Sequence, residues 1–320
     1  MNMSTNRLRT LVHDAWRINK PLTAVGLLMT VAAVASAAGL VLDARTILGV
    51  PAWLKPLKFA LSTAIYSFTF VWIFSYLPEW RSTRRVAGFI TAAIFVIEVG
   101  IIDVQVWRGT TSHFNTATVL DGALYTIMGV GIFLQTLASL FVAIALWRQT
   151  FTDPVIGWAF RLGMTMTLIG ASTGGLMTRP TAGQIAEARV THNLPVAGAH
   201  TVGAADGGPG LPGTGWSTEH GDLRVPHFVG LHAIQALAIV ALVIRRRHMS
   251  DSRGVRAIML AAASYAVLFA ILLSQALRGE PAIHPEAATQ AIMAAWAIVT
   301  TAAMWMLVAD SPLRRRVLIS

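Results

Sequence analysis

Eight long apolar stretches divide the chain, and shorter polar segments separate them. Each stretch is about as long as the roughly 20 residues that a helix needs to cross the hydrocarbon core of a bilayer. The pattern therefore predicts an all-α polytopic bundle of about eight transmembrane spans. These spans are placed near 21–42, 56–77, 86–107, 121–147, 155–178, 226–244, 255–277 and 287–309.

The composition agrees with this map, because 55% of the residues are hydrophobic and only 12% are charged. Soluble domains carry about twice that share of charge. Little length remains outside the spans, so we predict a single integral membrane domain over 1–320. A cleaved signal peptide is the alternative for the first stretch, since basic residues precede an apolar run with small residues at 35–37. The length of that run favours a retained helix.

The net charge of +10 follows the same map. Most basic residues fall in segments that we place in the cytoplasm together with both termini, as the positive-inside rule expects. We therefore predict a multi-pass protein of a bacterial-type inner (plasma) membrane. Its predicted partner is the lipid bilayer, and we expect no nucleic acid to bind. The residues concerned are Arg7, Arg9, Arg17, Lys20, Arg81, Arg84, Arg85, Arg148, Arg245 to Arg247, Arg253, Arg256 and Arg314 to Arg316.

The connection between the fifth and sixth spans, 179–225, lies on the opposite, outer side of this map. It is far longer than the usual connection of about four to six residues. Its centre, 202–216, is rich in glycine and proline, so we predict neither helix nor sheet there. Because histidines, an arginine and a tryptophan accompany this centre, we predict a lid over the outer mouth of the bundle. A flexible tether is the alternative.

Seven of the nine histidines fall on the outer side or in the outer half of a span. His232 and Gln235 are three residues apart in the sixth span and so share a face of the helix. Polar groups at membrane depth are costly and are functional candidates by default. We predict cofactor ligands at His113, His227 and His232, and metal ligands at His200, His220, His227 and His232. The alternative is that each histidine is a hydrogen-bonded structural residue.

Two carboxylates also lie at membrane depth, in the third span. Glu98 is near the middle and Asp103 is closer to the outer surface, about 140° further around the helix. Each needs a partner inside the bundle. We predict that Glu98, Asp103, Lys58 and Gln235 take part in proton transfer or ligand binding. The alternative is a structural pair between helices. In the fifth span, the four-residue spacing of Gly170 and Gly174 predicts close helix packing.

The chain has no cysteine, which excludes disulfides, thiolate metal sites, c-type haem attachment and cysteine-held iron–sulfur clusters. The chain has none of the common catalytic or nucleotide-binding motifs in a structural setting that would fit them: HExxH, GxSxG, the Walker loop or the dinucleotide-binding GxGxxG. The chain also lacks the EHxHR-like motifs of haem A synthases and the HxxxH pair of CREST hydrolases. No family is identified from its motifs.

These observations favour a membrane-embedded redox or metal-dependent protein that acts on a lipid-soluble or periplasmic substrate. The expected cofactor is haem b or a metal ion held by histidine and carboxylate. A proton-coupled transporter of a small ligand is the main alternative, with Glu98, Asp103, His232 and Lys58 as its relay. A non-catalytic scaffold or assembly factor is the third. The sequence does not decide whether the protein is an enzyme or what its oligomeric state is.

Overall fold

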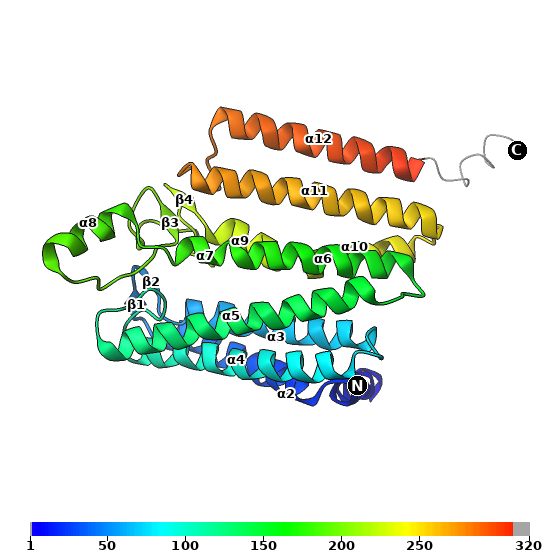
Figure 1. Ribbon diagram of the computed structural model, residues 1–320, viewed down its shortest axis with the longest axis horizontal. Coiled ribbons are helices and arrows are strands. Elements are labelled where there is room, and N and C mark those ends of the chain that lie inside the picture. Colours follow the sequence, from blue (N-terminus) through cyan, green and yellow to red (C-terminus); the bar gives the residue numbers. More distant parts are fainter. Residues whose placement is uncertain (1, 310–320) are drawn as a thin grey trace, which may run out of the picture. The chain divides into compact units, whose positions relative to one another are not determined.

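A computed structural model describes residues 2–309, and helices dominate it (Figure 1). The helices are α1 (Asn2–Ile18), α2 (Lys20–Leu42), α3 (Leu54–Ser75), α4 (Arg81–Trp107), α5 (Val119–Arg148), α6 (Pro154–Ser172), α7 (Gly174–Met177), α8 (Ala182–Thr191), α9 (Arg224–Leu231), α10 (Ala233–Arg246), α11 (Asp251–Leu277) and α12 (Ala287–Ala309). Four short strands form two hairpins: β1 (Thr46–Ile47) with β2 (Val50–Pro51), and β3 (Thr201–Val202) with β4 (Gly221–Asp222). The basic run at 314–316 lies outside the described residues.

The multi-pass helical architecture is confirmed. Within the described residues, seven helices are long and apolar enough to cross a membrane, or eight if α9 and α10 form one bent span. Several helices extend past the predicted apolar run, as α4 does by starting at Arg81 instead of residue 86. Backbone hydrogen bonding continues there into polar sequence, which hydropathy does not register. The side of the membrane on which the termini lie stays a prediction.

The chain divides into two compact units, each described here by itself. Unit 1 runs to Gln149 and also includes Met177–Ala199 and Ala205–Gly215, so it holds α1 to α5 and α8. Within it α2 packs on α3, and α4 packs on both α3 and α5. The largest fully buried side chains of this unit belong to these helices and the turn after α3: Leu22, Phe70, Ile73, Phe74, Leu77, Ile102 and Leu146.

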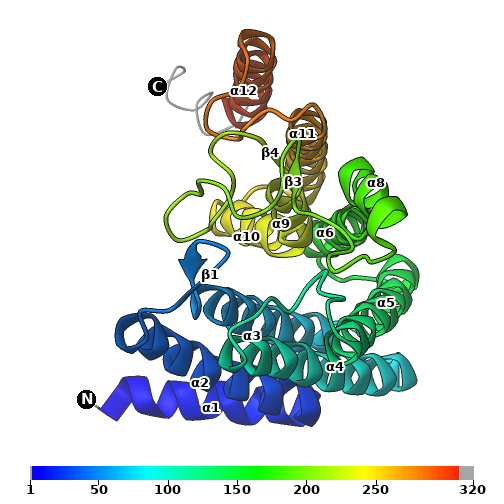
Figure 2. The ribbon, with the colours of Figure 1, turned by 90° about the vertical axis from the view of Figure 1, so that its left-hand side faces the viewer.

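Unit 2 comprises Thr150–Leu176, His200–Ala204 and the chain from Trp216 onward. Here α6 packs against α9, α10 and α11, and α11 runs beside α12 (Figure 1). The hairpin of β3 and β4 lies next to α11, as Figure 2 shows. A buried cluster of Met166, Ala233 and Phe269 joins α6, α10 and α11.

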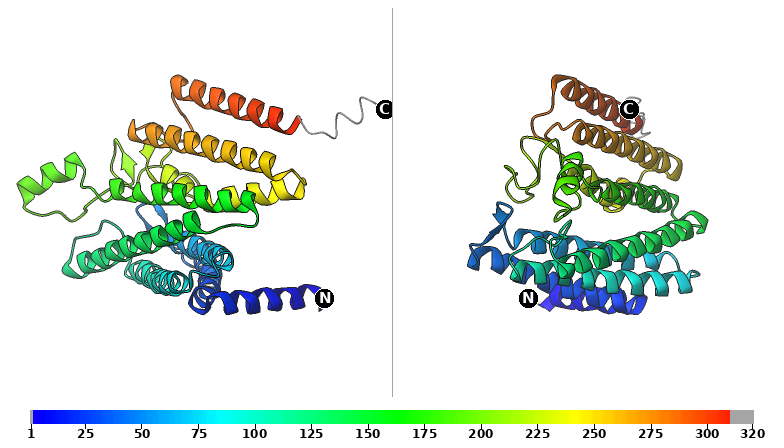
Figure 3. Two further views of the ribbon diagram at one scale, coloured as in Figure 1. Left: turned by 45° about the vertical axis from the view of Figure 1, so that its right-hand side comes forward. Right: turned by 60° about the vertical axis from the view of Figure 1, so that its left-hand side comes forward.

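Helix α1 has no counterpart among the predicted elements. Its exposed Leu8 and Leu11 alternate with Arg7 and Arg9, and it lies at a steep angle to the spanning helices of its unit (Figure 3). A helix with one apolar and one basic face is typical of the membrane interface. It was missed because only apolar runs long enough to span a bilayer were sought.

The long connection between α6 and α9 is more ordered than its composition predicts. Helix α8 starts with a reciprocal capping box between Thr181 and Gln184. Near the other end, β3 pairs with β4 in the register Thr201 to Asp222. Between them the chain follows turns with positive backbone φ angles, as expected for its glycines Gly203, Gly207, Gly213 and Gly215.

Candidate functional site

Unit 1 brings three ionisable side chains into a line of successive contacts. The Nζ atom of Lys55 lies 3.0 Å from Nδ1 of His113, and Nε2 of His113 lies 3.5 Å from Oε1 of Glu98. We call this line the Lys55–His113–Glu98 relay. Lys55 comes from α3, Glu98 from α4, and His113 from the loop between α4 and α5. Of the predicted site residues, Glu98 and His113 are therefore brought together.

The contacts define how the imidazole of His113 is protonated when Lys55 is charged. An ammonium group can only donate, so Nδ1 must accept its hydrogen bond. The hydrogen of the neutral ring then resides on Nε2, the atom that faces Glu98. The ring can thus receive a proton on one nitrogen and release a proton from the other.

Glu98 is the buried end of the relay. The residue is 2% exposed, and among the described residues neither carboxylate oxygen has a hydrogen-bond partner. The side chain of His113 is 23% exposed, so the relay leads from a solvent-accessible ring to an enclosed carboxylate. A structural ion pair normally satisfies both of its buried groups, because an unpaired buried charge is costly. Glu98 does not follow that pattern.

The position of Lys55 depends on the turn between α2 and α3. The Nε1 atom of Trp53 donates to Oδ2 of Asp43 at 2.8 Å, and Arg45 pairs with the same oxygen at 2.7 Å. The hydrogen bonds from Arg45 and then from Trp53 hold the pKa of Asp43 well below its usual range. The indole fills the space beside Gly39, where a Cβ atom would lie 2.5 Å from the ring. Lys55 follows Trp53 by two residues, so these contacts hold the start of α3 on which Lys55 lies.

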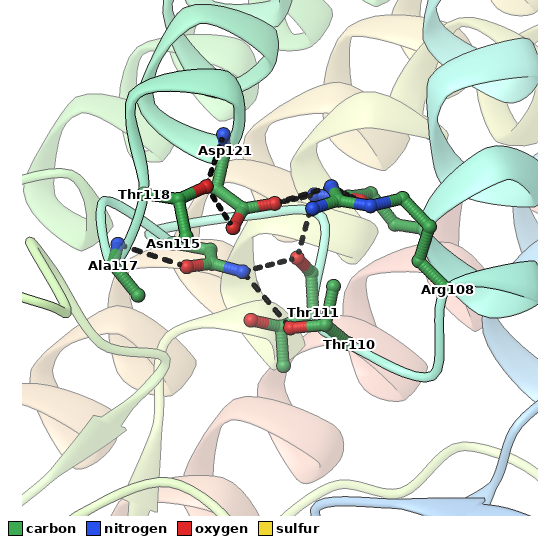
Figure 4. A network of polar contacts seen from close by, with 8 residues as sticks. Arg108, Thr110, Thr111, Asn115, Ala117, Thr118 and Asp121 are labelled. Atoms are coloured by element: carbon green, nitrogen blue, oxygen red, sulfur yellow. Dashed lines mark hydrogen bonds and ion pairs between the residues drawn. The ribbon is translucent and has the colours of Figure 1, made fainter.

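The position of His113 depends on a network of polar contacts in its loop (Figure 4). The Asp121 carboxylate accepts hydrogen bonds from Arg108 at 2.5 Å and from the Thr118 hydroxyl at 2.6 Å. The Asn115 amide donates to the Thr110 hydroxyl and the Thr111 carbonyl, and its oxygen accepts from the Ala117 N–H. These bonds close the loop on both sides of the histidine, so the ring is held by a rigid segment.

Two parts of the long connection between α6 and α9 belong to unit 1 and make contacts close to the relay. The Thr116 N–H donates to the Pro195 carbonyl at 2.9 Å, three residues after His113. Nζ of Lys58 donates to the Thr214 carbonyl at 2.5 Å. Lys58, predicted as a chemical residue, therefore holds the loop at the start of α3.

Asp103 does not face the relay. It follows Glu98 by five residues on α4, which places it about 140° further around the helix. Its Oδ1 atom is buried without a hydrogen-bond partner among the described residues. Whether it has a chemical role stays a prediction.

In unit 2, His232 occupies a break between α9 and α10, where the predicted continuous sixth span bends by 45°. The Thr167 hydroxyl donates to the Leu231 carbonyl and accepts from the Ile234 N–H, both at 3.2 Å. Backbone groups that a broken helix frees at membrane depth must find such partners. One side chain of α6 thus makes the break possible, and hydropathy carries no signal for it.

His227 lies one and a half turns before that break. Its Nδ1 atom is 2.9 Å from the Gly170 carbonyl and 3.1 Å from the Thr173 hydroxyl. A carbonyl only accepts, so Nδ1 carries the hydrogen and Nε2 keeps its lone pair. His200 and His232 are close enough to His227 to interact with it electrostatically. Unit 2 therefore gathers three predicted histidine ligands.

Gln235 and His220 are the other predicted residues of unit 2, and within the described residues only Gln235 is seen to contact this histidine group. Gln235 hydrogen-bonds the His232 ring, and the Phe228 ring lies 4.3 Å from that ring between centroids. His220 follows Ser217, whose hydroxyl accepts from the His220 N–H at 3.0 Å. Over residues 2–309, no group of three or more His, Asp or Glu side chains lies so that it could hold a metal ion. The predicted metal site gains no support from this geometry.

Lys58 was predicted as a site residue and Lys55 was not, and only the fold distinguishes the two lysines. Both lysines lie in the first turns of α3 and flank Pro56, so their local sequence is nearly equivalent. The partner that each one meets comes from a distant loop, His113 for Lys55 and Thr214 for Lys58. A contact of that kind leaves no signal in hydropathy or spacing.

Comparison of the chain with protein-family models, with curated proteins and with solved structures finds no match.

Proposed function

We propose that this protein is a proton-coupled transporter of a small ligand, and that the Lys55–His113–Glu98 relay carries the proton. The supporting observation is the enclosed carboxylate of Glu98, which lacks a hydrogen-bond partner among the described residues yet lies 3.5 Å from an imidazole nitrogen. Ionisable residues at membrane depth are typical of proton pathways in pumps and transporters.

The transfer step needs only proton movement. His113 takes a proton on Nδ1 from the Lys55 ammonium or from solvent. The N–H bond at Nε2 then breaks, and an O–H bond forms on Glu98. The separation of 3.5 Å is longer than a hydrogen bond, but such contacts often tighten in the working state. Imidazole suits this step because it changes charge between about pH 5 and 8.

The long connection supports a gating role at the same place. The connection is bonded to Thr116, which lies in the same loop as His113. It is also bonded to Lys58, which lies in the first turns of α3 as Lys55 does. Lids that close over a site control access of ligand and water. In the proposed transporter, release of the Lys58 bond to Thr214 opens the route to His113.

A redox or metal-dependent protein remains the second candidate, because His227 has two further histidines nearby and a lone pair on Nε2. Axial ligation of haem needs only two imidazoles from different segments. An absorption spectrum and a metal analysis of the purified protein separate the candidates. A Soret band or one metal ion per chain would favour the second, and neither signal is expected for the transporter.

Proton flux in sealed vesicles tests the proposed function. The purified protein is reconstituted with a pH-sensitive dye inside, and a potassium diffusion potential is imposed. Flux is measured with buffer alone and with a low-molecular-weight extract of the cells that produce the protein, because the ligand is unidentified. We expect protein-dependent acidification of the lumen in at least one condition. Equal signals in protein-free and protein-containing vesicles under both conditions would contradict the proposal.

A further inference from the structure

A second group of polar side chains lies deeper in unit 1, beyond the relay. The Tyr66 hydroxyl of α3 is 3.0 Å from Oγ of Ser139 on α5, and the Gln135 amide donates to the same oxygen at 3.2 Å. Ser139 and Gln135 are 3% and 7% exposed. We call this group the Tyr66–Ser139–Gln135 cluster.

Contacts with α4 place the cluster just inward of Glu98. Thr91, Phe95 and Glu98 follow each other at spacings of four and three residues, so they share one face of α4. The Tyr66 ring packs edge-on against Phe95, with 5.5 Å between centroids. The helical rise puts Phe95 about 4.5 Å from the level of Glu98 and about 6 Å from that of Thr91.

Helix α5 also reaches this face of α4. A Cβ atom at Gly131 would lie 3.3 Å from the Ile94 side chain, so α5 approaches α4 closely one turn from Gln135. The cluster therefore bridges α3 and α5 at the depth where both pack against α4.

Unsatisfied polar atoms occur on both helices beside the cluster, α4 and α5. Among the described residues, both oxygens of Glu98, Oε1 of Gln135 and Oγ1 of Thr91 are buried without a hydrogen-bond partner. Folded proteins satisfy nearly all such atoms, and ordered internal water is the usual partner where no protein group reaches. Three such sites in one layer of helices indicate a hydrated path.

We propose that the Tyr66–Ser139–Gln135 cluster and Thr91 position buried waters that carry the proton inward from Glu98. This inference rests on the proposed function. The O–H bond of protonated Glu98 breaks as a buried water accepts the proton, and an O–H bond of that water breaks as the next water along the cluster takes a proton from it. Tyr66, Gln135 and Thr91 are positioning residues in this route.

Tyr66→Phe tests the route because it removes the hydroxyl and keeps the ring that packs against Phe95. Tyr265→Phe is the matched control, since its hydroxyl bonds the Val229 carbonyl within unit 2, outside the route. We expect Tyr66→Phe to lower proton flux at least about tenfold and Tyr265→Phe to leave it within about twofold. The infrared carboxylic C=O band of Glu98 should still titrate in Tyr66→Phe, because proton entry from His113 is intact.

The outcomes separate this inference from the function on which it rests. If the wild type shows proton flux and Tyr66→Phe shows the same flux, the inward route is overturned but the relay is not. Loss of the Glu98 band together with flux would show that Tyr66 supports only the local fold, which also overturns the route. Absence of wild-type flux would overturn both. If Tyr66→Phe does not fold, Gln135→Leu is measured in its place, with the same expected loss of flux.

Discussion

Replacing Glu98 by glutamine is expected to reduce proton flux by about 100-fold or more, toward the level of protein-free vesicles. Glutamine has nearly the same shape as glutamate but cannot accept and release the transferred proton. The measurement is the dye assay in vesicles with imposed potassium potential. Glu187→Gln is the matched control, because Glu187 lies exposed on α8, and its flux is expected to equal that of the wild type.

The same substitution separates function from stability. Glu98 has no hydrogen-bond partner among the described residues, so a neutral amide at this buried position lowers the cost of burial. The thermal midpoint of Glu98→Gln in mild detergent is therefore expected to match or exceed that of the wild type. A destabilised variant that keeps its flux would mean that Glu98 is part of a structural pair and carries no proton.

Replacing Gly230 by alanine is expected to destabilise unit 2 by about 3 kcal/mol or more, at the upper end of overpacking costs. A Cβ atom at Gly230 would lie 2.3 Å from the Cα atom of Gly170, and one at Gly170 would lie 2.4 Å from that of Gly230. Backbone atoms of α6 and α9 cannot move aside as a flexible side chain does. The test is thermal or denaturant unfolding in mild detergent.

Gly129→Ala provides the control for this crossing. Gly129 is inside the spanning helix α5, and its Cβ position meets nothing within 4 Å. Alanine there is expected to leave stability unchanged or raise it by up to about 1 kcal/mol, since alanine favours helices over glycine. Equal effects of the two substitutions would mean that α6 and α9 do not cross as closely as described.

The spans could be predicted from the sequence because a bilayer imposes a long apolar run on every helix that crosses it. The structure differs from the predicted elements where hydrogen bonds of particular side chains shape the backbone. The break at His232 depends on the Thr167 hydroxyl from α6, and α8 depends on its capping box. The packing role predicted for Gly170 is confirmed by its contact with Gly230, although the partner glycine was not foreseen.

Two of the three residues of the candidate site, Glu98 and His113, could be named from the sequence, but Lys55 and the grouping of the three could not. Membrane depth drew attention to Glu98, and the placement of His113 on the outer side drew attention to that histidine, and the structure brings these two predicted residues together. Their pairing depends on a loop that the Arg108 and Asp121 contact closes, and such tertiary contacts leave no periodic signal. His232, predicted as a cofactor and metal ligand, occupies a helix break in unit 2, whereas the relay lies in unit 1.

The central claim is that Glu98 receives a proton through His113, and infrared difference spectroscopy tests it most directly. Wild-type protein in vesicles is compared with Glu98→Gln and His113→Phe while the outer pH is changed. We predict a carboxylic C=O band that appears on acidification of the wild type, is missing in Glu98→Gln, and forms much more slowly in His113→Phe. A band that persists in Glu98→Gln, or that forms equally fast without His113, would contradict the account.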